Sequence, residues 1–298
     1  MDSDERQPMS DDICFLDGEF LPLAEARISP LDRGFLFGDG VYEVIPVYHG
    51  RLFRFDAHMA RLERSLGETR IDAPYDRPRW RELMEALTER RGGGDLSLYL
   101  QVTRGAPQRR DHAFPDGQRP TVFMMASPLT PPDPRGRRVI LVDDTRGSRC
   151  DIKSVSLLAN VLLRQAALDA GADEAVVVRD GQVTEGAASN LFIVEDGTVI
   201  TPPNSPRLLP GITRDLILEL AAGDGIPCRE AAVSLAALRG ADEVWLSSST
   251  KEIIPVTHIN DETVAEGRAG PVWRRMRQLY DSFKATLADG DRREAAST

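Results

Sequence analysis

The basic residues of the chain are almost all arginines, which makes its few lysines candidates for chemistry that arginine cannot perform. Of 37 basic residues only three are lysines, Lys153, Lys251 and Lys284. Arginine never deprotonates in a protein, whereas a lysine can act as a nucleophilic amine. Lys153 lies in RCDIKS, between an extended apolar run and a helical pattern, where a side chain can project into a cleft, although its context is equally consistent with a structural role. We interpret Lys251 as a loop residue that meets an anion or solvent, and Lys284 as surface charge.

A second candidate is the cationic segment QVTRGAPQRRDHAFP, which carries Arg104, Arg109, Arg110 and His112 in a chain of formal net charge −10. The planar fork of arginine suits a carboxylate, and histidine adds a donor whose charge varies near neutral pH. This segment is therefore either a loop that captures a carboxylate or a solvated basic loop that pairs with neighbouring aspartates.

A third candidate is the segment LLPGITRDLILEL, in which Gly211 precedes a helix that starts near Ile212 and Thr213. Free amide groups and the positive end of the helix dipole make such a start a possible phosphate site, although an ordinary helix start has the same pattern. The sequence has no Walker loop and no GxGxxG motif that opens a helix after a strand.

Composition restricts the class of protein. With 298 residues the chain is long enough for two domains, and its acidic balance, with a pI near 5.0, argues against a general nucleic-acid or anionic-membrane binder. Cys14, Cys150 and Cys228 are an odd number without CxxC spacing, which favours a reducing compartment over a disulfide scaffold or zinc cluster. The N-terminal residues lack the apolar stretch of an export signal, so we expect a cytoplasmic protein without a membrane span.

The elements that must position the candidate residues begin with antiparallel sheet. Apolar runs separated by short turns predict β-hairpins at 13–21 and 41–55. Apolar residues at helical spacing predict two helices that cover one face of this sheet, one capped by Asp56 and one opened by Pro78. Further strands are predicted at 96–104 and 121–127.

The second half of the chain is predicted to form a separate domain. Short apolar strands alternate there with helical runs at about 155–170, 212–223 and 270–287, and Asp-Gly turns favour a mixed, largely antiparallel α+β domain over a doubly wound one. The proline-dense stretch before these strands is the expected linker. The predicted boundaries are 1–12 for a flexible N-terminus, 13–127 for a small domain, 128–136 for the linker, 137–287 for the second domain and 288–298 for a flexible tail.

Six segments in order resemble the pyridoxal-phosphate enzymes of fold type IV, the class IV aminotransferases, and among them the D-amino-acid aminotransferases. They are DRGFLFGDGVYEV, QVTRG with the triplet Arg110-Asp111-His112, RCDIKS, VTEGAASN, LPGITRD and SSSTKEI, and the resemblance runs from about residue 13 to 285. It implies an α+β fold with a smaller N-terminal α/β sandwich domain and a larger C-terminal domain of mixed, largely antiparallel strands with helices. It also implies pyridoxal 5′-phosphate as cofactor and a homodimer.

The resemblance assigns roles to single residues. Lys153 matches the lysine that forms the Schiff base with the cofactor and shuttles the substrate α-proton. Glu185 matches the carboxylate that pairs with the pyridine nitrogen, and Leu209 matches the residue packed on the ring face. The implied phosphate cup consists of Arg61, Ile212, Thr213, Ser248 and Ser249, with Ile212 and Thr213 acting through main-chain amides.

Tyr42, Arg110 and His112 match the trap for the substrate α-carboxylate, and the last two are implied to reach in from the partner subunit. With the carboxylate held there, only a D enantiomer presents its α-hydrogen to Lys153. The implied activity is ping-pong transfer of the amino group from D-alanine or another D-amino acid to 2-oxoglutarate. Within the family, the Arg-x-His triplet is the feature that favours a D-amino-acid aminotransferase over a branched-chain enzyme.

The sequence departs from the family pattern at three residues, and other functions remain as alternatives. Ala187 and Ala188 stand where hydroxyl residues are common in the family, and Lys251 stands where smaller polar residues are usual, so the substrate range stays open. On the same fold, the alternatives are a branched-chain L-amino-acid aminotransferase and aminodeoxychorismate lyase. A different class of protein, a non-catalytic binder of small anions, would use the cationic segment and the helix start without a covalent cofactor.

Overall fold

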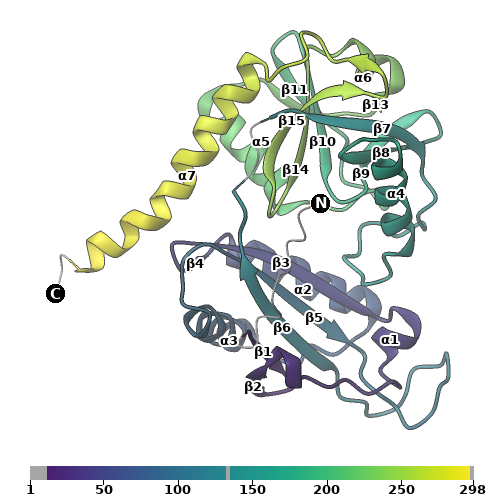
Figure 1. The fold of residues 1–298 in the computed structure, drawn as a ribbon, viewed down its shortest axis with the longest axis vertical. Helices are drawn as coiled ribbons and strands as arrows, with labels where there is room; N and C mark the ends of the chain where they lie inside the picture. The colour runs from purple at the N-terminus through teal and green to yellow at the C-terminus, as the bar shows by residue number, and fades with distance from the viewer. Residues whose placement is uncertain (1–11, 132–134, 296–298) are drawn as a thin grey trace, which may run out of the picture. The chain divides into compact units, whose positions relative to one another are not determined.

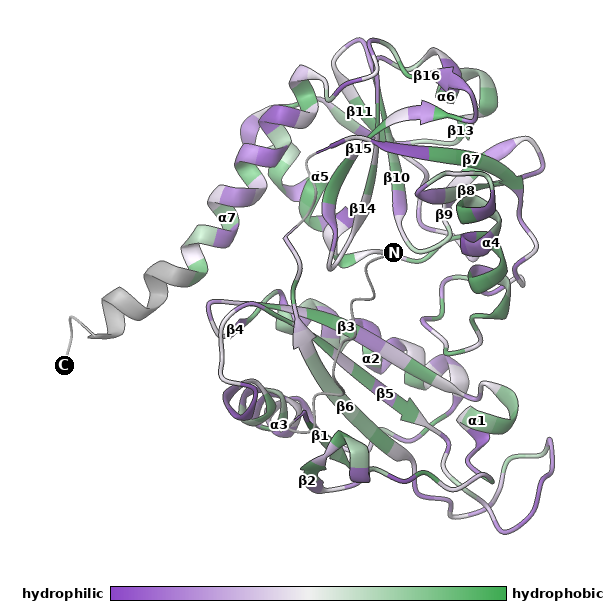
Figure 2. Cartoon of the chain, viewed as in Figure 1, coloured by the Kyte–Doolittle hydropathy of each residue, from purple (hydrophilic) through white to green (hydrophobic). Residues whose placement is uncertain are grey.

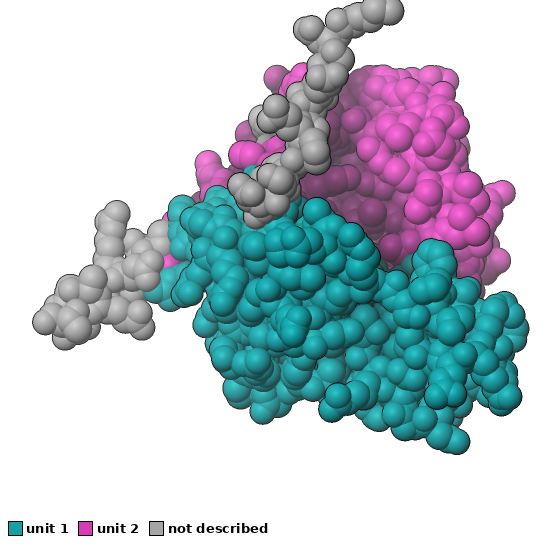
Figure 3. All heavy atoms as spheres, turned by 60° about the horizontal axis from the view of Figure 1, so that its bottom comes forward, with its two compact units in different colours: residues 1–129, 153–156 teal, residues 130–152, 157–298 magenta. Residues whose placement is uncertain are grey.

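The computed structural model describes residues 12–131 and 135–295, with side chains as far as residue 287. The chain divides into two compact units, which Figure 3 distinguishes by colour: residues 1–129 with 153–156, and residues 130–152 with 157–298. Almost all of the N-terminal segment expected to be flexible, and residues 132–134 of the expected linker, lie outside the described residues. The short stretch 153–156 belongs to the first unit although the sequence on both sides belongs to the second.

An antiparallel sheet forms the centre of unit 1 (Figure 1). Its described strands number six in the order β2-β1-β6-β5-β3-β4. In β5 every second residue is buried, as expected for a strand with one face on a core, and Figure 2 shows apolar residues along β3, β5 and β6. The strands are β1 (Ile13–Leu16), β2 (Glu19–Pro22), β3 (Gly40–Tyr48), β4 (Arg51–Leu52), β5 (Leu96–Thr103) and β6 (Thr121–Pro128).

Two helices, α2 (Phe55–Thr69) and α3 (Arg77–Arg90), pack against this sheet as predicted. The assignment of Asp56 as a helix cap was wrong. The cap of α2 is Arg54, which adopts a left-handed conformation with φ of 52°, and Asp56 lies in the first helical turn, where its carboxylate faces the positive end of the helix dipole. Asp76 caps α3 by accepting a hydrogen bond from the Arg79 amide at 2.9 Å.

Two shorter helical elements of unit 1 were not predicted. They are the helix α1 (Arg33–Phe37) and the 3-10 turn η1 (Leu23–Glu25). Five and three residues are too few to produce a helical apolar period. Asp32 caps α1 by accepting a hydrogen bond from the Gly34 amide at 2.8 Å.

Unit 2 is built on a mixed, largely antiparallel sheet, as predicted. Its strands among the described residues follow the order β12-β11-β10-β14-β15-β7-β8-β9-β13, and β16 pairs with β15. The parallel pairs are β7 with β8, β7 with β15, and β11 with β12. The strands are β7 (Arg137–Asp143), β8 (Glu174–Arg179), β9 (Gln182–Gly186), β10 (Asn190–Glu195), β11 (Thr198–Thr201), β12 (Cys228–Glu230), β13 (Val233–Ser234), β14 (Glu243–Ser248), β15 (Glu252–Ile259) and β16 (Glu262–Thr263).

The helices of unit 2 are α4 (Leu158–Asp169), α5 (Ile212–Asp224), α6 (Leu235–Gly240) and α7 (Pro271–Ala295). Helix α5 packs against β14 and α7, and α4 packs against β8. Helix α7 extends to Ala295, so its backbone is helical through most of the segment that was expected to be a tail. Among the described residues, no helix is both long and apolar enough to cross a membrane.

Candidate active site

Lys153 is held beside Tyr42 by main-chain pairing. The Tyr42 amide donates to the Lys153 carbonyl at 2.9 Å, and the Val155 amide donates to the Gly40 carbonyl at 3.0 Å. These bonds attach residues 153–156 to β3. The Lys153 ammonium lies 4.1 Å from the centroid of the Tyr42 ring, a cation–π distance. Two candidate residues that are far apart in the sequence are therefore neighbours.

Next to this pair, a buried network holds Arg61. Glu43 is fully buried and accepts hydrogen bonds from Arg61 Nε at 2.8 Å and Arg61 Nη2 at 2.7 Å. Its Oε2 also lies 2.8 Å from His58 Nδ1. Burial would raise the pKa of Glu43, but the charge and hydrogen bonds of Arg61 outweigh burial and lower it. Arg61 is thus a buried, oriented cation.

Glu43 and His58 were missed in the sequence. Each offers a weak signal: Glu43 is a lone acidic residue in the apolar strand β3, and His58 stands three residues before Arg61 on α2. Burial lowers the pKa of His58, against the opposing effect of Glu43, and the charges of Arg61 and Lys153 lower it further. This influence of Lys153 links the network electrostatically to the lysine.

The cationic segment divides into a structural part and an exposed part. Arg104 is buried, donates to both carboxylate oxygens of Asp39 and also donates to the main-chain carbonyl of Arg70, so it serves the fold. Arg110 and His112 are exposed and converge on one aromatic ring. The guanidinium of Arg110 lies 4.8 Å from the centroid of Phe37, and the His112 ring lies 5.0 Å from it.

In unit 2, Glu185 is a buried carboxylate on β9. It accepts hydrogen bonds from the Leu209 amide at 3.1 Å and from Asn190 Nδ2 at 3.4 Å, and it forms an ion pair with Arg146. Burial raises the pKa of Glu185 to about 7, although Arg146 opposes the shift. Arg146 and Asn190 were not predicted, because only the tertiary fold brings them to this carboxylate.

The start of α5 has the form expected of an anion site. Gly211 is its N-cap and has no side chain that could satisfy the first amides. Asn190 Nδ2 donates to the Leu209 carbonyl at 2.8 Å, and a Cβ atom on Gly211 would come within 1.9 Å of Asn190 Oδ1. The helix start and the carboxylate of Glu185 are therefore connected through one asparagine.

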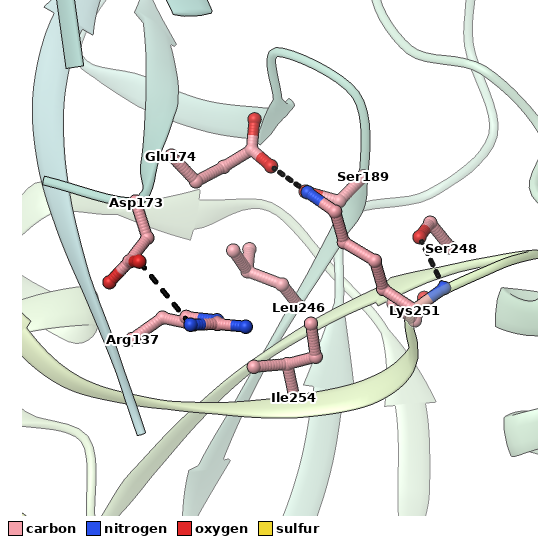
Figure 4. Close-up of a pocket in the computed structure, with 9 residues that line it drawn as sticks. Arg137, Asp173, Glu174, Ser189, Leu246, Ser248, Lys251 and Ile254 are labelled. Carbon is pink, nitrogen blue, oxygen red and sulfur yellow. Dashed lines mark hydrogen bonds and ion pairs between the residues drawn. The ribbon is translucent and has the colours of Figure 1, made fainter. Parts of the chain in front are cut away.

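Of the two predicted serines, Ser248 ends β14, where Figure 4 shows it, and Ser249 lies in the turn that leads to β15. Ser248 Oγ accepts a hydrogen bond from the Lys251 amide at 3.3 Å, which leaves the hydroxyl proton of Ser248 available to another acceptor. Ser249 is half-buried in the same turn. Ser247 Oγ is buried and has no hydrogen-bond partner among the described residues. This turn thus offers hydroxyl donors, as an anion site requires.

Both remaining lysines form ion pairs. Lys251 Nζ lies 3.5 Å from Oε2 of the buried Glu174, at the edge of a small pocket that Ser189 also lines (Figure 4). The interpretation of Lys284 as surface charge was wrong: its Nζ lies 2.7 Å from the buried Glu252 and 3.1 Å from Asp281. A buried carboxylate needs a partner, and each of these lysines supplies one.

The predicted site residues therefore fall into two groups. Tyr42, Arg61, Arg110, His112 and Lys153 lie in unit 1. Glu185, Leu209, Ile212, Thr213, Ser248 and Ser249 lie in unit 2. The first group offers an amine and cations, and the second offers a buried carboxylate, helix-start amides and hydroxyls. These are the types of group that bind a phosphate or a carboxylate, pair with a protonated nitrogen or exchange a proton.

Comparison with known proteins agrees with this chemistry. The sequence pattern described as amino-transferase class IV matches residues 40–259. D-alanine aminotransferase of Bacillus licheniformis is 40% identical over 262 residues, which cover 87% of this chain and 92% of that protein. D-alanine aminotransferase of Staphylococcus aureus strain MW2 is 37% identical over 273 residues, covering 90% and 96%.

Solved structures show the same fold. A branched-chain amino acid aminotransferase of Escherichia coli superposes with a TM-score of 0.85 at 29% identity, covering 91% of this chain and 94% of that chain. A hypothetical aminotransferase from Mycobacterium tuberculosis in its PLP-bound form has a TM-score of 0.80 at 26% identity, covering 91% and 98%. The predicted fold type IV architecture is confirmed, and the chain belongs to the class IV aminotransferases.

Proposed function

We propose that this protein is a pyridoxal-phosphate-dependent D-amino-acid aminotransferase, which transfers the amino group of D-alanine or another D-amino acid to 2-oxoglutarate in a ping-pong cycle. The observation that carries the proposal is the exposed pair Arg110 and His112 on a single aromatic ring, in a unit that also holds an oriented lysine. The 40% identity to a D-alanine aminotransferase supports the same substrate class.

The residues present fit the cofactor. Glu185 is a buried carboxylate with a raised pKa, and it would be stabilised by a protonated pyridine nitrogen beside it. Ile212 and Thr213 would offer their amides to the phosphate, together with Ser248 and Ser249 and the cation of Arg61. Within the described part of the chain, the buried hydroxyl of Ser247, near the end of β14, has no hydrogen-bond partner. Leu209 would pack on the ring.

The chain's own residues would handle substrate and protons. When bound, pyridoxal phosphate supplies an electron sink for the electron pair that remains after the α-proton leaves. Lys153 would take that proton on Nζ and later return it. The adjacent Tyr42 ring, whose centroid lies 4.1 Å from Nζ, would help to orient this amine. Glu185 would keep the pyridine nitrogen protonated.

Selectivity for D substrates follows from where the carboxylate is bound. Arg110 provides a bidentate fork, and His112 and Tyr42 provide further donors, so the α-carboxylate would be held on one side. Lys153 would approach from a fixed face, and only the D enantiomer then places its α-hydrogen toward the amine. A branched-chain L-aminotransferase, supported by the structural likeness to the enzyme of Escherichia coli, is the second candidate.

We also propose a homodimer in which Arg110 and His112 act in the partner's site. Helix α4 supports this with an apolar stripe of Leu158, Val161 and Leu162, which are 74%, 60% and 60% exposed in the single chain. Such a stripe is typical of a surface covered by another protein chain. A cytoplasmic location remains part of the proposal, and the free thiols of all three cysteines support it.

A substrate comparison on the holoenzyme tests the activity. The protein is incubated with 2-oxoglutarate and either D-alanine or L-leucine, and the oxo acid produced from each donor is quantified. We expect turnover of D-alanine to pyruvate, with glutamate formed in the D configuration. Transamination of L-leucine alone would instead establish the branched-chain candidate.

Covalent attachment of the cofactor tests the assignment of Lys153. Borohydride reduction should bleach the visible band and fix the label to Lys153, and Lys153→Ala should abolish transamination while the fold is retained. Lys251→Ala is the matched control, because it removes another lysine and should keep both label and activity. A protein that stays colourless with added pyridoxal phosphate would favour the small-anion binder.

A further inference from the structure

The short helix α1 contacts the loop that carries Arg110 and His112. Arg33, at its first position, is only 3% exposed. Its guanidinium donates to three consecutive main-chain carbonyls of this loop: Nη1 to Asp111 and, at 3.1 Å, to Ala113, and Nη2 to His112 at 3.2 Å. One side chain therefore fixes the peptide groups next to the two exposed residues Arg110 and His112.

The orientation of Arg33 is itself determined by Asp39. Arg33 Nε donates to Asp39 Oδ2 at 2.7 Å, and Arg104 donates to the same carboxylate. These contacts outweigh the effect of burial and lower the pKa of Asp39, so its charge persists. Only the planar fork of arginine can bind a carboxylate with one edge and carbonyls with the other, so lysine could not replace Arg33.

Phe37, four residues later, extends the same contact to the side chains. The guanidinium of Arg33 lies 4.9 Å from the centroid of its ring, and that of Arg110 lies 4.8 Å from it. The His112 ring is 5.0 Å away at an interplanar angle of 37°. Both residues proposed to bind the substrate carboxylate thus rest on one aromatic ring, which restricts their rotamers before substrate arrives.

Close contacts with β5 and with the start of the loop fix the position of α1. A Cβ atom on Gly34 would come within 2.3 Å of Thr103 Cγ2, so α1 approaches β5 as closely as only glycine permits. Thr103 Oγ1 donates to the capping residue Asp32 at 2.9 Å. The Arg33 amide donates to the Gly105 carbonyl at 2.9 Å, so the start of the loop is anchored as well.

We infer that Arg33 and Phe37 are positioning residues for Arg110 and His112, and that they give the site in which these two residues act its specificity for substrates with an α-carboxylate. The inference rests on the proposed function, in which Arg110 and His112 bind that group. Arg33 holds the loop main chain, and Phe37 aligns the side chains of Arg110 and His112. Loss of either residue weakens carboxylate binding without touching the amine of Lys153 or the residues proposed to hold the cofactor.

Replacement of the Phe37 ring distinguishes a positioning role from a general structural role. In Phe37→Leu, we expect KM for D-alanine to rise about fivefold, and Kd of propionate, a carboxylate without an amino group, to rise equally. The kcat and the pyridoxal phosphate content should stay near wild type, because the lysine and cofactor residues are unchanged. Propionate binding is followed through the cofactor absorbance of the holoenzyme, without turnover.

Two further variants complete the experiment. Phe35→Leu makes the same change in the same helix at a side chain that is 77% exposed, and it should leave KM and the propionate Kd unchanged. Phe37→Tyr retains the ring and should restore both constants. Arg33→Lys should raise both constants as Phe37→Leu does, and if it fails to fold, the Phe37 variants decide alone.

The outcomes are distinguishable. Equal constants for Phe37→Leu and Phe35→Leu, or a fall in kcat or cofactor content without a rise in KM, would overturn the inference. A wild-type holoenzyme that does not transaminate D-alanine would overturn the proposed function instead. A raised KM and propionate Kd restored by Phe37→Tyr would support the positioning role.

Discussion

At the scale of single residues, two buried glutamates have pKa values shifted in opposite directions. Burial acts to raise the pKa of both. At Glu43, two hydrogen bonds from Arg61 and a contact from His58 outweigh burial, so that the net pKa is lowered. At Glu185 burial outweighs the effect of Arg146, and the pKa rises to about 7. Glu43 is thus a permanent anion that orients a cation, whereas Glu185 can gain or lose a proton near neutral pH.

The raised pKa of Glu185 predicts a pH-dependent stability of the apoprotein. Between its ordinary pKa of 4.5 and about 7, the folded state keeps a proton that the unfolded chain has released. Stability therefore falls as the pH rises through this window, by on the order of 2–3 kcal/mol in total. Urea unfolding of the apoprotein at pH 5 and pH 8 measures the fall.

Glu185→Gln is the variant that isolates this effect. It cannot titrate, so its stability relative to wild type should increase from pH 5 to pH 8, and other titrating groups cancel in the difference. A difference between the two proteins that is independent of pH would show that Glu185 is already ionised in the folded apoprotein.

At the scale of elements, the start of α5 depends on the absence of a side chain at Gly211. Gly211→Ala would displace Asn190, which donates to both Leu209 and Glu185. We expect a loss of about 1–3 kcal/mol in stability, as for overpacking elsewhere. We also expect weaker binding of pyridoxal phosphate, because the helix start and Glu185 would lose their common contact. Urea unfolding and titration of the apoprotein with the cofactor measure the two effects.

Gly223 provides the matched control in the same helix. A Cβ atom there would meet nothing within 4 Å, and alanine is the better helix former. Gly223→Ala should therefore stabilise the protein by about 0.5–1 kcal/mol and leave cofactor binding unchanged. Equal cofactor affinities for the two variants would argue against a role of the α5 start in phosphate binding.

At the scale of the whole molecule, the proposed exchange of Arg110 between subunits predicts complementation. Lys153→Ala and Arg110→Ala each damage every site of their own homodimers. In a mixed dimer one of the two sites receives an intact Lys153 from one chain and an intact Arg110 from the other. An equimolar mixture with random assembly should recover about a quarter of wild-type activity. Activity is measured with D-alanine well below its KM, where Arg110→Ala is least active.

The double variant provides the control for this experiment. The double variant carries both substitutions in one chain and is mixed with wild type. If Arg110 acts across the interface, each site of such a mixed dimer contains one damaged residue. If Arg110 acts within its own chain, co-assembly of the two single variants should give no activity beyond that of the separate proteins. That result would contradict the cross-subunit arrangement while leaving the role of Arg110 itself open to the KM measurement.

Local elements of this protein could be predicted because their causes are local. The turns at Asp180-Gly181 and Asp196-Gly197 have positive φ at both residues, from 48° to 74°, and glycine and aspartate are among the residue types that adopt this conformation. Helix α5 begins at Ile212 as expected from the glycine before it. Helix α4, in contrast, begins at Leu158 rather than near 155, because residues 153–156 pair with β3, which is distant in the sequence.

The sequence by itself determined the class of enzyme, since motif types and their order carry the chemistry of the amine, the carboxylate and the helix start. Only the tertiary structure decided how the charged residues pair. It buried Arg104 on Asp39, placed Arg110 on Phe37, and gave Glu185 the partner Arg146. The physical reason is that a charge's partner and pKa depend on which groups folding brings within hydrogen-bond distance and how much water they lose, and local spacing specifies neither.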